Sequence, residues 1–366
     1  MKNFLTLILL LLMSLLLVLP AHAADIEDEQ LDALGGDELV EAVPDSAELG
    51  EMGIMDALET EHSFLALFKR VKKNVSDAAF AGVRNALAII STAALCAVAG
   101  TIFTKNSGIN YVDLTGVLTV GSISAGGVTS FISQAAAVIG DLNAFSKALL
   151  PTLAAAATAS GAVTSASAKL AASALFMDIF ITISLDVVMP LIYALFALSL
   201  CSCAVGGMGL DSAVGVIKRV IKAVLTTMTL LFTVYISISG VVSETADAAA
   251  VKVAKSVISS SLPIVGSMIS DAASTVLSGL TVLKSAVGIF GMIVVCGVCI
   301  MPFIYLAVNY LLYKAAAFFA ECVSGSGVAK MIDATASVYA AILGTIGVDA
   351  IMIFFSIISF IRTVTV

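Results

Sequence analysis

Residues 286–312 read AVGIFGMIVVCGVCIMPFIYLAVNYLL, a run of 27 residues without a charged side chain. About 20 apolar residues are enough for a helix to cross the ~30 Å hydrocarbon core of a bilayer. Similar runs recur in a chain that is 60% hydrophobic and only 12% charged. They are long and do not alternate polar with apolar residues, which favours helices over a β-barrel. The sequence therefore predicts an all-α, polytopic helical integral membrane protein, and it excludes a soluble enzyme.

The first 23 residues have the pattern of a secretory signal peptide. Lys2 precedes an apolar run, and Ala21-His22-Ala23 supplies a cleavage site of small residues. We expect residues 1–23 to be removed, with an uncleaved membrane anchor as the alternative. Residues 24–62 carry 14 acidic side chains and no Lys or Arg, so the net charge of −8 comes from this leader. Its high charge and few large apolar groups predict an extracytoplasmic segment that is disordered or forms short transient helices.

Residues 63–85 predict a basic amphipathic helix ahead of the membrane body. Apolar side chains recur at helical spacing, while Lys69, Arg70 and Lys73 lie on the opposite face. Such a helix suits either the headgroup layer of a membrane or the surface of another subunit. These three bases are therefore candidate contacts with lipid or with a partner.

The membrane body is expected to contain about six spans in residues 86–242 and about two in residues 286–366. The candidate spans are 86–103, 114–139, 149–168, 171–186, 188–207, 223–242, 286–312 and 335–361. The loop containing Lys218, Arg219 and Lys222 is the most basic, and basic loops favour the cytoplasmic side. We therefore expect this loop in the cytoplasm of a protein of the cell membrane.

Three carboxylates, Asp178, Asp186 and Asp349, lie within or between these apolar runs. A carboxylate inside a membrane is costly and often marks an ion or proton pathway. The three are candidate functional residues on that ground. For Asp186, which precedes Pro190 closely, a tight turn between two spans is the favoured interpretation.

No constellation for catalysis or for holding a cofactor occurs in the sequence. Both histidines fall within the first 62 residues, so the membrane body has none. The pairs Cys201-x-Cys203 and Cys296-x-x-Cys299 lie inside apolar runs, which favours buried thiols over a metal or redox site. The phosphate-binding pattern G-x-x-x-x-G-K-[ST] is missing as well. We predict no enzymatic activity, no catalytic residue, no metal and no cofactor.

Residues 243–285 are too polar to span a membrane and too apolar for a free loop. On a helical wheel Glu244, Asp247, Lys252 and Lys255 share one side, and Pro263 ends this helix. A second short helix follows. We expect both helices on the membrane surface or against a partner, with the four charged side chains as candidate contacts.

Two blocks of the chain resemble a known family. Residues 145–161, FSKALLPTLAAAATASG, are similar to a Lys-x-Leu-Leu-Pro…Ala-Ser-Gly stretch of that family. Residues 237–277, SISGVVSETADAAAVKVAKSVISSSLPIVGSMISDAASTVL, followed by LKSAVGIFG, are similar to its most recognisable block. The family is stage III sporulation protein AE of endospore-forming bacteria. The resemblance covers roughly residues 141–321, with Ser267 standing where a glycine is expected.

The resemblance implies a polytopic, non-catalytic core subunit of the complex that joins the mother cell to the engulfed forespore, pictured as a channel or feeding conduit. It implies other membrane proteins as partners, a separate cytoplasmic ATPase as energy source, and a place in the mother-cell membrane around the forespore. Membrane lipid is an expected contact, and nucleic acid is not. The residues alone leave open an autonomous secondary transporter or channel that uses the intramembrane aspartates.

Overall fold

A computed structural model describes residues 31, 34–47, 53–54, 82–99, 111–205, 208–261, 266–323 and 326–362. The regular elements in this part of the chain are all helical. Six of the helices are long and apolar enough to cross a membrane, which confirms the predicted all-α, multi-pass class. The predicted signal peptide and the bases Lys69, Arg70 and Lys73 lie outside the described residues.

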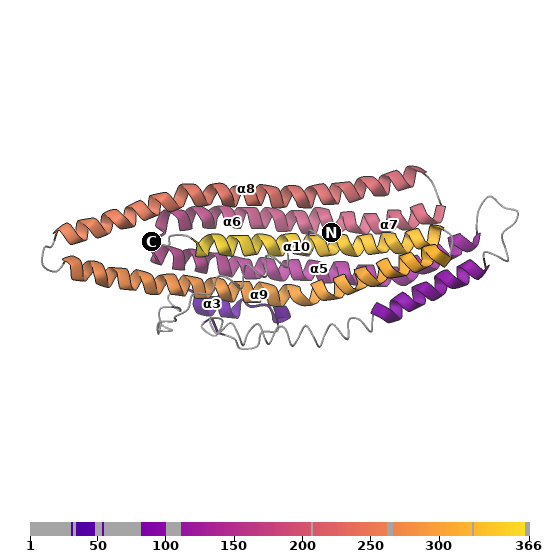
Figure 1. Ribbon diagram of the computed structural model, residues 1–366, viewed down its shortest axis with the longest axis horizontal. Coiled ribbons are helices and arrows are strands. Elements are labelled where there is room, and N and C mark those ends of the chain that lie inside the picture. The colour runs from indigo at the N-terminus through magenta and orange to yellow at the C-terminus, as the bar shows by residue number, and fades with distance from the viewer. Residues whose placement is uncertain are drawn as a thin grey trace.

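The long helices lie along one elongated bundle, and the chain reverses its direction at each turn between them (Figure 1). In chain order the long elements are Gly82–Ala99, α5 (Tyr111–Ala159), α6 (Val163–Ile183), the π-helix η3 (Ser184–Val188), α7 (Met189–Val205), α8 (Met208–Ser261), α9 (Gly266–Val323) and α10 (Ser326–Ile361). Two short elements of the leader are α3 (Gly36–Glu41) and the 3₁₀ helix η1 (Asp45–Ala47).

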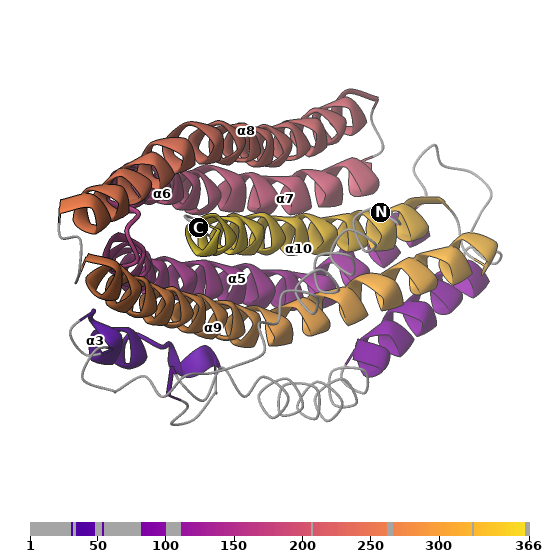
Figure 2. The same ribbon diagram turned by 60° about the vertical axis from the view of Figure 1, so that its left-hand side comes forward.

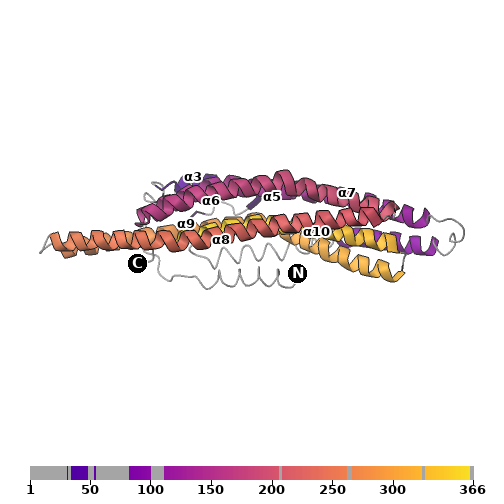
Figure 3. The same cartoon turned by 90° about the horizontal axis from the view of Figure 1, so that it is seen from above.

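The long helices form two layers, with α5, α6 and α7 in one and α8, α9 and α10 in the other (Figure 3). α10 contacts α9 and α5 most extensively and also touches α6, α7 and α8. The most apolar segments of α9 and α10 are 67% buried, compared with 22% for that of α8. The core of the bundle therefore lies along α9 and α10.

Aromatic side chains join the layers at two places. Tyr339 of α10 is fully buried and meets Phe131 of α5 and Tyr313 of α9 edge to face, with ring centroids 5.3 and 5.1 Å apart. Phe176 of α6 packs against Phe232 of α8 at 6.2 Å. Edge-to-face pairs at these separations are favourable beyond their area burial, so both clusters fix how the layers align.

The eight segments expected to span fall on six helices, because neighbouring segments merge. The described residues of 171–186 and 188–207, up to Val205, belong to one continuous helix, and the turn predicted at Asp186 is wrong. Pro190 lacks the N–H that an α-helix would use to bond four residues back. The π-helix ahead of it absorbs this loss, since Met189 N–H bonds to the carbonyl of Ser184, five residues earlier. The chain thus passes the proline without turning.

Residues 149–168 do not cross as one helix, since they contain the turn between α5 and α6. Gly161 has φ 99°, a left-handed conformation that glycine adopts without strain. Ala162 N–H donates a hydrogen bond to the carbonyl of Ala157, and Gly161 N–H donates one to the carbonyl of Thr158, both with a length of 3.0 Å. This pair of bonds is the Schellman pattern of a helix end. Buried small residues on both sides of this turn let α5 and α6 approach closely.

Part of the acidic leader is folded, contrary to the disorder predicted for it. α3 contacts α5 and η1 contacts α9, and Figure 2 shows both short elements at the edge of the bundle. Leu39 and Ala47 are fully buried, and Ser46 Oγ donates a hydrogen bond of 2.6 Å to Asp141 Oδ2. A Cβ at Gly297 would lie 3.0 Å from the backbone oxygen of Ala47, so glycine permits this approach. Apolar side chains spaced along the leader thus anchor it to the bundle.

The two helices expected in residues 243–285 are the far ends of α8 and α9. α8 ends at Ser261, two residues before Pro263, and α9 begins at Gly266. Both continue without a break into the predicted spans, and their ends reach past the neighbouring helices in Figure 1. At 1.5 Å per residue, the 54 residues of α8 extend about 80 Å. That is more than twice a hydrocarbon core of ~30 Å, so part of α8 lies outside the hydrocarbon.

Candidate functional site

One of the three predicted carboxylates lies inside the bundle. Asp349 of α10 is 1% exposed. Its Oδ1 accepts a hydrogen bond of 3.1 Å from Ser184 Oγ, at the first residue of the π-helix. Its Oδ2 has no hydrogen-bond partner among the described residues. Leaving a buried acceptor unpaired costs about 1–3 kcal/mol, and the described residues by themselves do not satisfy this carboxylate.

α9 and α10 carry other polar or irregular features. Cys299 of α9 is buried and close enough to Asp349 to interact with it electrostatically. Pro302, inside α9, cannot donate a hydrogen bond to the carbonyl of Val298, four residues earlier. Ser356, two turns beyond Asp349, is buried, and its hydroxyl has no partner among the described residues. An unpaired carboxylate oxygen beside irregular backbone is an arrangement that can accept a proton or a small cation.

Two buried lysines, Lys169 of α6 and Lys284 of α9, were missed in the sequence analysis. Lys169 Nζ donates a hydrogen bond of 3.0 Å to the backbone oxygen of Ser359. A buried ammonium is costly unless hydrogen-bonded, and this carbonyl near the end of α10 supplies such a bond. The signal was available in the sequence, because each lysine stands alone among small or apolar neighbours.

The other two predicted carboxylates point away from the bundle. Asp178 of α6 and Asp186 of η3 are exposed on the outer face of the α5–α6–α7 layer. They share this face with exposed aliphatic side chains, among them Leu175 and Ile179. The structure therefore does not bring Asp178 and Asp186 together with Asp349, and the three do not form one relay.

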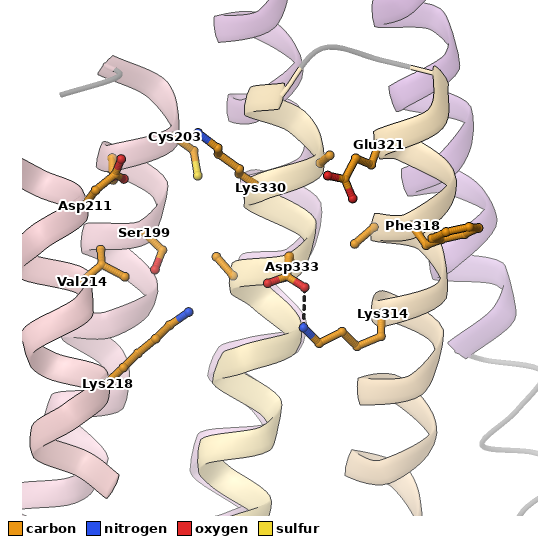
Figure 4. Close-up of a pocket in the computed structure, with 14 residues that line it drawn as sticks. Ser199, Cys203, Asp211, Val214, Lys218, Lys314, Phe318, Glu321, Lys330 and Asp333 are labelled. Atoms are coloured by element: carbon orange, nitrogen blue, oxygen red, sulfur yellow. Dashed lines mark hydrogen bonds and ion pairs between the residues drawn. The ribbon is translucent and has the colours of Figure 1, made fainter. Parts of the chain in front are cut away.

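A cavity of about 640 Å³ opens near the ends where α7 meets α8 and α9 meets α10. Lys314 pairs with Asp333 across it (Figure 4). Ser202 donates a hydrogen bond to Asp211. Lys218, from the loop region predicted to be cytoplasmic, extends into the cavity from α8. Three bases and three acids line it: Lys218, Lys314, Lys330, Asp211, Glu321 and Asp333. Because these charges balance, the cavity favours neither anions nor cations.

The remaining predicted contacts are four charged residues of α8. The positions of Glu244, Asp247, Lys252 and Lys255 fall on the described backbone of α8, but their side chains lie outside the described part of the structure. Their role as lipid or partner contacts stays a prediction. Within the described residues, no group of three or more His, Cys, Asp or Glu side chains could hold a metal ion.

The sequence matches the profile of stage III sporulation protein AE over residues 53–363, nearly the whole length of the bundle. The chain belongs to the stage III sporulation protein AE family. This confirms the resemblance seen in the two sequence blocks.

A curated member of the stage III sporulation protein AE family gives the same relationship. The chain is 25% identical over 226 residues to stage III sporulation protein AE of Bacillus subtilis (strain 168). The match covers 62% of this chain and 57% of that relative, so the chain spans little more than half of the relative's length. No solved structure matches the chain.

Proposed function

We propose that this chain is a polytopic, non-catalytic membrane subunit of the sporulation complex that links the mother cell to the forespore. The family match over residues 53–363 carries the proposal, because the family is one of sporulation proteins. The bundle adds six helices that are able to span a membrane. The proposed location is the mother-cell membrane around the forespore. Other membrane proteins of the complex are the proposed partners, and a separate cytoplasmic ATPase supplies the energy.

The lengths of the helices support a subunit role. α8 and α9 have 54 and 58 residues, and either is more than twice as long as a bilayer's hydrocarbon core is thick. Their far ends and the charged cavity at the opposite end therefore offer protein surface on both sides of the membrane. A subunit that connects components on two sides needs such surfaces.

Deletion of the gene in its own spore-forming host tests this proposal. We expect spore development to stop after engulfment, because the connection between the two cells is lost. A plasmid copy of the full chain should restore heat-resistant spores. Normal numbers of heat-resistant spores from the deletion strain would contradict the proposal.

The proposed orientation puts the α7–α8 end in the cytoplasm and the α8–α9 end outside. Ser212 and Ser256 lie near the two ends of α8 and are suitable sites for single cysteines once the six native cysteines are replaced. An impermeant thiol reagent added outside should label Ser256→Cys and spare Ser212→Cys. If Ser256→Cys were labelled only from the cytoplasm, the orientation would be the inverse of the one proposed.

An autonomous secondary transporter is the second candidate, and it rests on Asp349. The unpaired Oδ2 of this buried carboxylate beside a π-helix is the feature that favours it. Purified protein in liposomes should then drive proton-coupled uptake that Asp349→Asn abolishes and Asp178→Asn, on the outer face, leaves intact. Absence of flux from the pure protein would count against this candidate.

A further inference from the structure

The outer face of α6, η3 and α7 carries exposed side chains at helical spacing. We call this face the α6–α7 stripe, and its main members are Leu175, Asp178, Ile179, Asp186, Val187 and Tyr193. It lies on the layer formed by α5, α6 and α7 (Figure 3). Leu175 is 65% and Ile179 52% exposed, so no described element covers them.

Neither lipid nor water suits the α6–α7 stripe. Carboxylic side chains such as those of Asp178 and Asp186 are costly in hydrocarbon and face protein or a wet cavity when they occur in membrane helices. Large exposed aliphatic groups such as Leu175 and Ile179, next to one another, mark a site of interaction when they face water. A protein surface that is mainly apolar and carries positive charge satisfies both kinds of side chain.

The outer face of α8 provides the contrast. Leu230, Leu231 and Val234 are exposed there, Leu230 by 61%. No charged residue occurs in α8 between Lys222 and Glu244, so this face suits lipid without a partner. The α6–α7 stripe differs from it by its two carboxylates.

We propose that the α6–α7 stripe docks a transmembrane helix of a partner membrane protein, and that this helix carries two basic side chains facing Asp178 and Asp186. The inference rests on the proposed function and names the kind of partner that a subunit of the complex would bind. The two carboxylates are eight residues apart, about 12 Å along the helix. The partner's bases must therefore be about two turns apart, and arginine suits carboxylates best because it binds them with two parallel hydrogen bonds.

A second copy of this chain fits the stripe less well. Arg219 and Lys222, exposed on α8, are three residues apart, about 4.5 Å, and cannot face both carboxylates at once. Lys147 is exposed on α5 with no second basic residue in that helix. Among the described side chains, no exposed pair of bases on one helix has the spacing that the stripe requires.

Photocrosslinking in the spore-forming host tests the docking face with the full chain. A benzoylphenylalanine probe is placed at Ile179 in the stripe or, as the matched control, at Leu230 on the outer face of α8. We expect the Ile179 probe to join one membrane protein, at a peptide from an apolar helix with two bases about two turns apart. The Leu230 probe should give no protein adduct.

Charge changes then separate docking from mere proximity. The double variant Asp178→Asn/Asp186→Asn should lower the yield of the Ile179 adduct by about tenfold or more, since it removes two partly desolvated ion pairs. The amount of chain in the membrane should stay the same. Asp178→Lys/Asp186→Lys should also lose the adduct, and exchange of the partner's two bases for aspartate should restore it.

Three results would overturn the docking face: adducts of the chain with itself, no protein adduct at Ile179, or an unchanged yield in the double variant. The deletion strain keeps this failure distinct from that of the proposed function. If the deletion blocks sporulation while the yield of the Ile179 adduct stays the same in the charge variants, only the docking face is wrong. If the deletion strain forms normal spores, the proposed function itself fails.

Discussion

Asp349 and the pair Asp178 and Asp186 are carboxylates of one apolar chain in opposite surroundings. Asp349 lies in the α9–α10 core, where one oxygen accepts a hydrogen bond from Ser184 and the other has no partner within the described part of the chain. Asp178 and Asp186 lie on the outer face, among exposed aliphatic side chains. The difference separates two roles: the inner carboxylate affects how the bundle itself holds together, and the outer pair affects what the bundle can bind.

The largest expected effect comes from the core around Tyr339. Tyr339→Ala removes a fully buried ring that touches Phe131 and Tyr313, and should lower the free energy of unfolding by about 3–5 kcal/mol. Leu230→Ala, on the outer face of α8, should change it by about 0.5 kcal/mol or less. Thermal unfolding of both variants in detergent measures the difference. Equal effects would mean that α9 and α10 do not form the core.

A second, smaller effect should come from the partner of Asp349. Ser184→Ala removes the hydrogen bond to Oδ1 and leaves the whole carboxylate unpaired, at a cost of about 1–3 kcal/mol. Adding Asp349→Leu should recover most of this loss, because the buried carboxylate that lacks partners is then removed. Unfolding free energies of the two single variants and the double variant form a double-mutant cycle. Strictly additive effects would show that Ser184 and Asp349 do not interact.

The sequence predicted some of these features and not others, for physical reasons. The uncharged run 286–312 lies inside α9, and α8 ends just ahead of Pro263, because hydrophobicity and proline act locally. The orientation of Asp178 and Asp349 was not predictable, because both stand in similar apolar runs and only their neighbours in space distinguish them. The continuous helix at Pro190 depends on the π-helix before it, which no local pattern revealed.

The folded part of the leader also depends on distant residues. Its negative charge predicted disorder, yet η1 reaches the bundle because Gly297, about 250 positions later in the chain, leaves room for Ala47. Such a contact between segments far apart in the chain is invisible to composition and to helical periodicity. The apolar residues within the leader, Leu39 among them, were the available signal.

Gly297→Val should loosen the leader with little effect on the bundle. The new side chain would press on the backbone of Ala47, so η1 should move away while overall stability changes by about 1 kcal/mol or less. Limited proteolysis should then cut the leader faster than in the unaltered chain. Gly140→Val is the matched control, since a Cβ there meets nothing within 4 Å. Equal cleavage rates in the two variants would contradict the docking of η1 on α9.

The smallest expected effect is on the stability of the isolated chain when the outer pair is neutralised. Asp178→Asn/Asp186→Asn removes no described hydrogen bond and should shift the unfolding free energy by about 0.5 kcal/mol or less. Unfolding in detergent measures this shift. A loss as large as that of Ser184→Ala would place these carboxylates among the groups that hold the bundle together.

The most direct test of the contrast is the number of heat-resistant spores formed by the Asp178→Asn/Asp186→Asn strain, with the amount of the chain in the membrane measured alongside. If the outer pair serves assembly and not folding, spore numbers should fall by about tenfold or more while the amount of chain is unchanged. Full spore numbers at a normal amount of chain would contradict the account.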